Sequence, residues 1–134
     1  MTLGDYLLTL NAKRREPGVH DCVTLPADWT VALGLPDPMA AWRGTYDTEE
    51  GALEIIEQAG SLESLFAAGY ASIGIEERYD EPREGDVAVL RVGEQEAGSI
   101  YTGRRWVFVG ERGIGFSSVD QDCIVTVWAV GDHG

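Results

Sequence analysis

Near the N-terminus, a histidine, an aspartate and a cysteine stand together as His20-Asp21-Cys22. These residue types suit a cysteine hydrolase, in which a thiol attacks a carbonyl carbon after a nearby base has taken its proton. Asp21 is a good helix N-cap, so we expect Cys22 in the first turn of a helix. The free backbone N–H groups and the helix dipole at that place favour a thiolate. Cys22 and His20 are therefore the candidate catalytic residues.

Each of these residues also has a simpler structural interpretation. Cys22 is then a small, half-buried residue at a helix start. His20 lies two positions before Cys22 and outside the helix, so the two side chains need not converge, and His20 instead packs in the loop and bonds to the backbone. Asp21 and Asp28 could form an acid–base pair. An N-cap role for Asp21 and a bond from Asp28 to a neighbouring loop are the alternatives.

Composition limits the class of protein. The chain has 134 residues, 44% of them hydrophobic, and four tryptophans, which suits one folded domain over residues 1–134. Its net charge of −13 argues against nucleic acid as a partner, because phosphate backbones are met by clustered Lys and Arg. The sequence shows neither a signal-peptide pattern nor an apolar run that would cross a bilayer, so we expect synthesis in a cytoplasm without a membrane span.

The cysteine and histidine content argues against a metal or cofactor site. Cys22 and Cys123 are far apart in sequence and are expected as free thiols in a reducing compartment. The sequence has no CxxC motif and only two histidines, so we expect no structural zinc and no other metal or cofactor. The acidic clusters lack the spacing of a calcium loop, and we interpret them as solvated surface or as a face for a basic partner.

Four helices are predicted in the first half of the chain. The first covers residues 2–12, with Thr2 as its cap, and the second covers residues 22–33. Asp47 opens the third in a capping-box spacing, and Gly60 ends it. Ser61 caps the fourth. The buried stripe of the third helix is expected to comprise Leu53, Ile55, Ile56 and Ala59.

After Gly69 the hydrophobic period changes to that of strands. Short segments rich in β-branched and aromatic residues alternate with glycine or charged turns. Because the turns are short, we expect a meandering antiparallel sheet. Helices followed by such a sheet define the α+β fold class. The expected strand segments are residues 73–75, 86–92, 99–102, 106–109, 114–116 and 124–130.

The tryptophans are expected mainly as buried anchors, because each contributes a large area to a small core. A platform for sugar rings is the alternative for Trp29, Trp42, Trp106 and Trp128. Residues 35–46, with two prolines and Trp42, form a predicted loop that could fill a groove in the fold.

This order of elements resembles the NlpC-like cell-wall peptidases, which have a papain-like fold. In that family the catalytic cysteine follows an aspartate, as in Asp21-Cys22. A Pro-Gly-Asp type motif announces the first sheet strand, and Pro82-Arg83-Glu84-Gly85-Asp86 is similar to it. The next strand carries the catalytic histidine in a His-Val-Gly-Ile-Tyr-x-Gly pattern. The corresponding run here is Ala97-Gly98-Ser99-Ile100-Tyr101-Thr102-Gly103.

The chain departs from this family at the base. The alignment places Ala97 where the peptidase has its histidine. The strand Trp106-Val107-Phe108-Val109 offers no polar group that would orient such a histidine. A thiol nucleophile needs both a base and a partner for that base. The resemblance therefore implies a papain-like fold with degenerate catalytic machinery.

A second resemblance covers nearly the whole chain. It is to a family of small phage and prophage proteins, often encoded among tail genes. The shared features, in order, are Gly-x-His-Asp-Cys, Ala27-Asp28-Trp29, Trp42-Arg43-Gly44-Thr45-Tyr46, a Gly-Asp-Val strand and Trp128-Ala129-Val130. This resemblance implies a structural or assembly protein of a phage tail or tail tip, located in the virion and made in the host bacterial cytoplasm. Other tail or baseplate proteins are the implied partners.

Two alternatives remain open. The chain could be an active cysteine hydrolase that cleaves cell-wall peptides during infection, with Cys22 as nucleophile, His20 as base and backbone N–H groups as the oxyanion hole. It could also bind wall peptides in peptidoglycan without cutting them.

Overall fold

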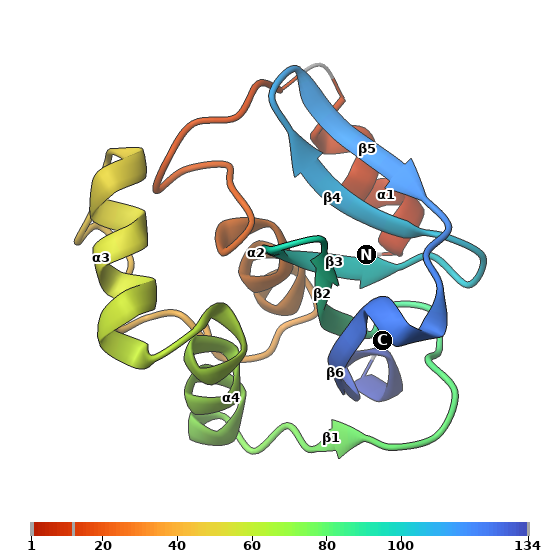
Figure 1. The fold of residues 1–134 in the computed structure, drawn as a ribbon. Coiled ribbons are helices and arrows are strands. Elements are labelled where there is room, and N and C mark those ends of the chain that lie inside the picture. The colour runs from red at the N-terminus through yellow and green to blue at the C-terminus, as the bar shows by residue number, and fades with distance from the viewer. Residues whose placement is uncertain (1, 12, 134) are drawn as a thin grey trace.

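A computed structural model describes residues 2–11 and 13–133 of the chain. Within this range four helices precede a six-stranded sheet, which confirms the predicted α+β class (Figure 1). The predicted end of the first helix, Ala12, lies outside the described residues. The elements are α1 (Leu3–Thr9), α2 (Thr24–Ala32), α3 (Glu49–Ala59), α4 (Leu62–Ser72), β1 (Glu77–Arg78), β2 (Val87–Val92), β3 (Gln95–Tyr101), β4 (Trp106–Gly110), β5 (Gly113–Ser117), η1 (Gln121–Cys123), β6 (Ile124–Trp128) and η2 (Val130–His133).

Hydroxyl side chains cap three of the helices. Thr2, Thr48 and Ser61 each accept a hydrogen bond from the backbone N–H three residues later, at 3.1, 3.0 and 3.0 Å. The prediction of Asp47 as the third cap is wrong, because Thr48 has the extended backbone of an N-cap, with φ −131° and ψ 161°. Gly60 ends α3 as predicted, at a φ of 107° that favours glycine.

The sheet is antiparallel throughout but is not a simple meander. Its strand order is β1-β6-β2-β3-β4-β5, so the last strand returns to lie between the first two. β6 and β3 flank β2, and Val87 pairs with both Trp128 and Ile100. The closing Trp128-Ala129-Val130 segment therefore reaches the centre of the domain. The local hydrophobic pattern of the sequence does not predict this long-range pairing.

The strand predicted at residues 73–75 is wrong. Ile73 follows the last turn of α4, and its N–H donates to the carbonyl of Tyr70 at 3.2 Å. Ile75 is buried in the connection that follows, and the first strand begins at Glu77. Both isoleucines pack on the core from a turn, which produces the same alternation as a strand.

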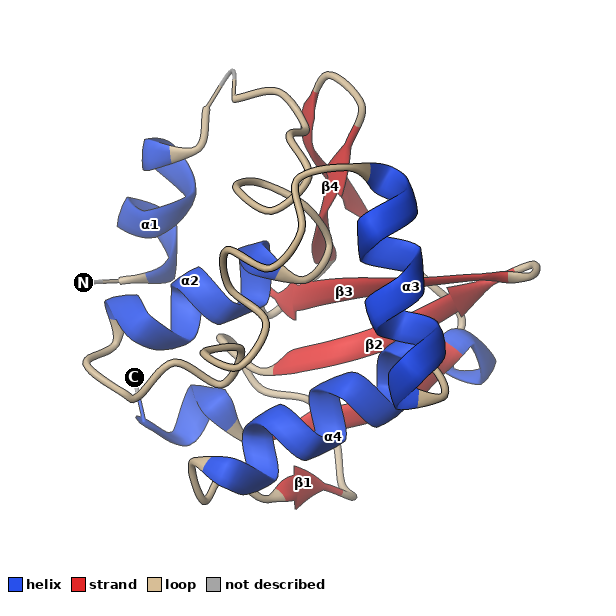
Figure 2. Ribbon diagram, turned by 90° about the vertical axis from the view of Figure 1, so that its left-hand side faces the viewer, coloured by secondary structure: helices blue, strands red, loops and turns tan. Residues whose placement is uncertain are grey.

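The main core lies between the helices and one face of the sheet. Figure 2 shows α3 and α4 in front of β2 and β3. Trp128 stacks on Tyr70 with ring centroids 5.6 Å apart, and Phe66 of the same helix lies 5.8 Å from Trp128. The opposite face of the sheet carries a smaller cluster around Leu90 and Trp106. Trp29, Trp106 and Trp128 are buried as predicted, whereas Trp42 is half-buried.

Helix α3 is the exception to this packing. None of its residues is fully buried, and Leu53 is 57% exposed, so the predicted buried stripe is wrong for this residue and only partly formed at Ile55, Ile56 and Ala59. The helix packs mainly against α4 and stands at the side of the molecule in Figure 1. A hydrophobic period predicts an apolar helix face but not that another element covers it.

In the part of the chain that the structure describes, no helix has both the length and the apolar character needed to cross a membrane.

Candidate functional site

The turn before α2 is organised by the buried side chain of Asp21. One carboxylate oxygen accepts the backbone N–H groups of Val23 and Thr24, at 2.9 and 2.8 Å. The other oxygen accepts the Gly18 N–H at 2.8 Å and the Tyr46 hydroxyl at 2.6 Å. Four donors from three segments thus meet one carboxylate, which is how a buried charge is tolerated.

Asp21 and Thr24 also bond reciprocally. The backbone N–H of Asp21 donates to the Thr24 hydroxyl oxygen at 2.8 Å, as in a capping box. The Asp21 carbonyl accepts from Leu25 N–H at 3.0 Å, which is the helical pattern. The regular helix begins only at Thr24, so Asp21 caps the turn that leads into α2 and Cys22 lies in that turn.

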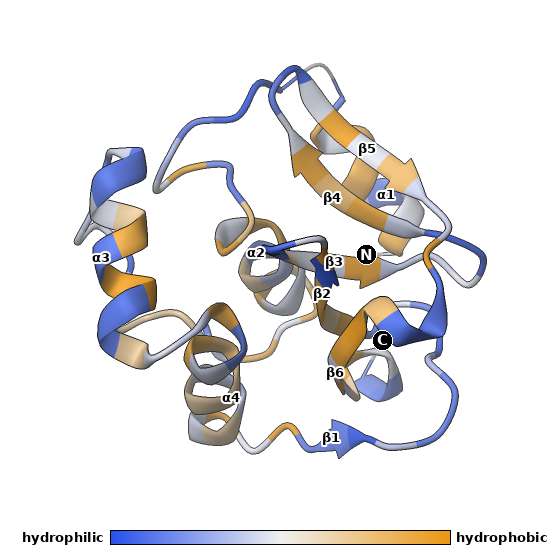
Figure 3. Cartoon of the chain, in the orientation of Figure 1, coloured by the Kyte–Doolittle hydropathy of each residue, from blue (hydrophilic) through white to orange (hydrophobic). Residues whose placement is uncertain are grey.

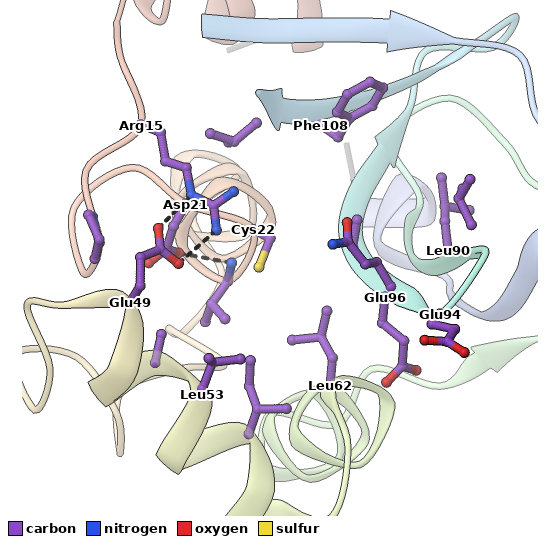
Figure 4. A pocket seen from close by; sticks show the side chains of 18 of the residues that line it. Arg15, Asp21, Cys22, Glu49, Leu53, Leu62, Leu90, Glu94, Glu96 and Phe108 are labelled. Atoms are coloured by element: carbon purple, nitrogen blue, oxygen red, sulfur yellow. Dashed lines mark hydrogen bonds and ion pairs between the residues drawn. The ribbon is translucent and has the colours of Figure 1, made fainter. Parts of the chain in front are cut away.

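Cys22 opens onto a pocket of about 750 Å³, and Figure 4 shows its sulfur directed into this space. Burial, together with the neighbouring Asp21 carboxylate, raises the pKa of the Cys22 thiol to about 11. The expectation of a favoured thiolate is therefore wrong. The backbone N–H groups of Val23 and Thr24, which would stabilise a thiolate, are already bonded to Asp21.

His20 does not share the pocket wall with Cys22. It is buried, with 2% of its surface exposed, and its backbone N–H and C=O are bonded to Glu16 at 2.8 and 2.9 Å. Burial lowers the pKa of His20, and the positive charge of Lys13 lowers it further. Its Nε2 atom has no hydrogen-bond partner among the described residues. The structure thus places His20 as a packed loop residue.

Asp28 is held by an arginine and takes no part in the pocket. Arg43 bridges Asp28 at 2.6 Å and Asp37 at 2.5 Å. Burial raises the pKa of Asp28 against the opposing effect of Arg43. Asp28 bonds to a neighbouring loop, as the simpler interpretation predicted, and does not form an acid–base pair with Asp21. The Arg43–Asp28 ion pair ties the loop over residues 35–46 to α2, and this loop does not line the pocket.

The strand beside Cys22 brings no base to it. Ala97 lines the same pocket, but its side chain ends at a methyl group. In the β2–β3 register Ala97 pairs with Leu90, which belongs to the cluster on the far face of the sheet. Gly98 is the residue packed on Cys22: a Cβ atom there would lie 2.0 Å from the Cys22 carbonyl oxygen. The closest strand position therefore has no room for any side chain.

The other ionisable groups of the pocket wall are mostly acidic. Arg15 and Glu49 form an ion pair at 3.0 Å on one side, and Figure 4 shows Glu94 and Glu96 on the opposite side. No histidine is among the described residues that line the pocket. Sequence reasoning missed these groups, because three separate segments bring them together. Arg43 and Tyr46 were singled out from the sequence only as members of the Trp42-Arg43-Gly44-Thr45-Tyr46 motif. Their contacts with Asp28 and Asp21 were not predicted.

Over residues 1–130 the chain matches the model of a family described as a domain of unknown function, DUF6950, and it belongs to that family. No curated protein and no solved structure matches the chain.

We expect Tyr46→Phe to destabilise the fold by about 1–3 kcal/mol, because it removes a hydrogen bond to a charged, buried acceptor. Urea unfolding of the variant and the wild type measures this. The matched control is Tyr79→Phe, at a side chain that is 90% exposed, with an expected change below about 0.5 kcal/mol. Equal effects of the two substitutions would contradict the role given to Tyr46.

The lowered pKa of His20 predicts a pH-dependent stability. In the unfolded chain His20 takes up a proton near its ordinary pKa of 6.5. In the folded chain its pKa is lower, so it takes up the proton only at a lower pH. The contribution of His20 to stability is therefore fully present above pH 6.5 and is lost as the pH falls from 6.5 toward the lower pKa of the folded state. Urea unfolding at about pH 7.5 and about pH 5.5 should show a larger loss for wild type than for His20→Gln. Identical losses would show that His20 is not the responsible group.

Proposed function

We propose that the chain is a non-catalytic domain of papain-like, NlpC-like fold. In this proposal it acts by protein–protein contact, as a structural or assembly component of a phage tail or tail tip. Its place is in the virion, with other tail or baseplate proteins as partners. The order of its parts supports the class: a cysteine at the start of a helix, followed by an antiparallel sheet whose second long strand packs on that cysteine.

The observation that carries the non-catalytic assignment is the segment Ala97-Gly98 beside Cys22. An activated thiol requires a base within hydrogen-bond reach, and that base requires an orienting partner. Ala97 supplies a methyl group and Gly98 has no space for a side chain. His20 is buried and is not among the residues that line the pocket. The raised pKa of Cys22 also leaves the thiol protonated at neutral pH.

The motifs shared with the phage family have structural roles that suit a scaffold. Gly18 has a φ of +83°, and a Cβ there would lie 2.4 Å from the Tyr46 carbonyl oxygen. The Trp29 indole N–H donates to the Gly85 carbonyl at 2.8 Å, which ties α2 to the Gly-Asp-Val strand. Asp21 holds Tyr46, and Asp28 holds Arg43. These contacts explain the spacing of the motifs without any catalytic role.

Release of muropeptides from purified cell wall tests the non-catalytic assignment. We expect no release by wild type or by Cys22→Ser, while an active cell-wall peptidase serves as positive control. Release by wild type and not by Cys22→Ser would contradict the proposal and identify a cysteine hydrolase. Binding of muropeptides without release would instead favour a wall-binding domain.

Analysis of purified particles tests the tail assignment. We expect the chain to co-purify with the tail at a fixed ratio to other tail proteins, measured by quantitative mass spectrometry. Particles carrying Cys22→Ser should assemble and infect normally. Absence of the chain from intact particles would contradict a place in the virion.

A further inference from the structure

The exposed apolar face of α3 borders the Cys22 pocket. Figure 3 shows hydrophobic residues along the side of this helix that faces α2. Leu53 and Ile56 line the pocket from α3, and Leu62 lines it from the start of α4. Leu53 is 57% exposed although it points into this space, as Figure 4 shows. A leucine in this position is one that a bound apolar group would cover.

The opposite wall of the pocket offers a backbone edge. β3 pairs with β2 along its whole length, but with β4 only through Ile100 and Tyr101. Among the described strands, residues 95–97 therefore have no partner on their second side, and these residues line the pocket. An extended peptide can add to such an edge through main-chain hydrogen bonds while its side chains enter neighbouring pockets.

The charges of the wall select the kind of peptide. Four carboxylates, those of Asp21, Glu49, Glu94 and Glu96, accompany one guanidinium, that of Arg15. Arg15 is paired with Glu49, and Glu96 is paired with Arg91 at 3.4 Å. Asp21 is buried and bonded to four donors, so Glu94 is the carboxylate of the wall that has no ion pair among the described residues, and the surplus is negative. The whole chain carries −13, which opposes binding of a second copy, a nucleic acid or an anionic membrane. A cationic segment of another protein is the complementary occupant.

We propose that the groove between α3 and β3 binds an extended, basic peptide segment of a partner protein. One or more bulky apolar side chains of that segment enter between Leu53 and Leu62. Its Lys or Arg side chains meet Glu94 and compete with Arg91 for Glu96. This inference rests on the proposed function, because it names the chemistry of the partner for a domain that works by contact. The volume of about 750 Å³ lies within the range of specific ligand pockets.

Selection from a displayed library of short random peptides tests the groove. The library is selected in parallel on wild type and on Leu53→Arg, which places a cation on the exposed apolar face. We expect wild type alone to enrich peptides with Leu, Ile, Phe or Trp flanked by Lys or Arg. Enrichment of acidic peptides, or the same enrichment on both proteins, would overturn the proposal. So would a selection in which neither protein enriches any sequence.

The affinity of an enriched peptide, labelled with fluorescein, is then measured by anisotropy. Leu53→Arg and Glu94→Lys should each weaken it about tenfold or more, and added salt should weaken it as well. The matched controls lie outside the pocket at exposed positions: Leu8→Arg on α1 and Glu111→Lys in the β4–β5 turn. Both should leave the affinity within about twofold. Equal losses from groove and control variants would overturn the assignment of the site.

The two proposals fail in different ways. Muropeptide release by wild type contradicts the non-catalytic function whether or not basic peptides bind. Failure of the peptide selection, with no muropeptide release, contradicts the groove and leaves the non-catalytic function standing. A dimer in light scattering that Leu53→Arg abolishes would show that a second copy occupies the groove, which also overturns the peptide proposal.

Discussion

The buried carboxylate of Asp21 is the constraint on which the rest of the site depends. A buried charge is tolerated only when it is fully bonded, and Asp21 meets this need with donors from Gly18, Val23, Thr24 and Tyr46. The loop before α2, the first turn of α2 and the loop ending at residue 46 must therefore converge on one point. Removing a donor weakens the attachment of all three segments.

This arrangement also determines the chemistry of Cys22. Burial is the largest cause of the raised pKa of Cys22. The Asp21 carboxylate adds to it, because it occupies the N–H groups of the helix start and opposes a second negative charge nearby. The strand packed on Cys22 contributes Gly98, where a side chain would collide with the Cys22 carbonyl. The pocket thus encloses a thiol of raised pKa, and no histidine is found among the described residues of its wall. What remains accessible is a pocket with apolar walls and acidic sides.

Features that depend on neighbouring residues were predictable from the sequence. Thr2, Ser61 and Gly60 mark helix ends because caps act within one turn. The change of hydrophobic period indicated helices followed by a sheet, but it was placed after Gly69, inside α4, and so the boundary was wrong by several residues. Features that depend on distant residues were not. The insertion of β6 beside β2, the exposure of Leu53 and the raised pKa of Cys22 all follow from which elements meet in three dimensions.

The ionisation of Cys22 tests the central claim most directly, since a non-catalytic pocket requires a thiol that is not activated. The measurement is the alkylation rate by iodoacetamide as a function of pH in a Cys123→Ser background, where Cys22 is the remaining cysteine. A pKa of about 11 predicts a rate that is very low at neutral pH and still rises at about pH 10. An alkylation rate that reaches its plateau at about pH 7 would reveal a stabilised thiolate and contradict the claim that Cys22 is not activated.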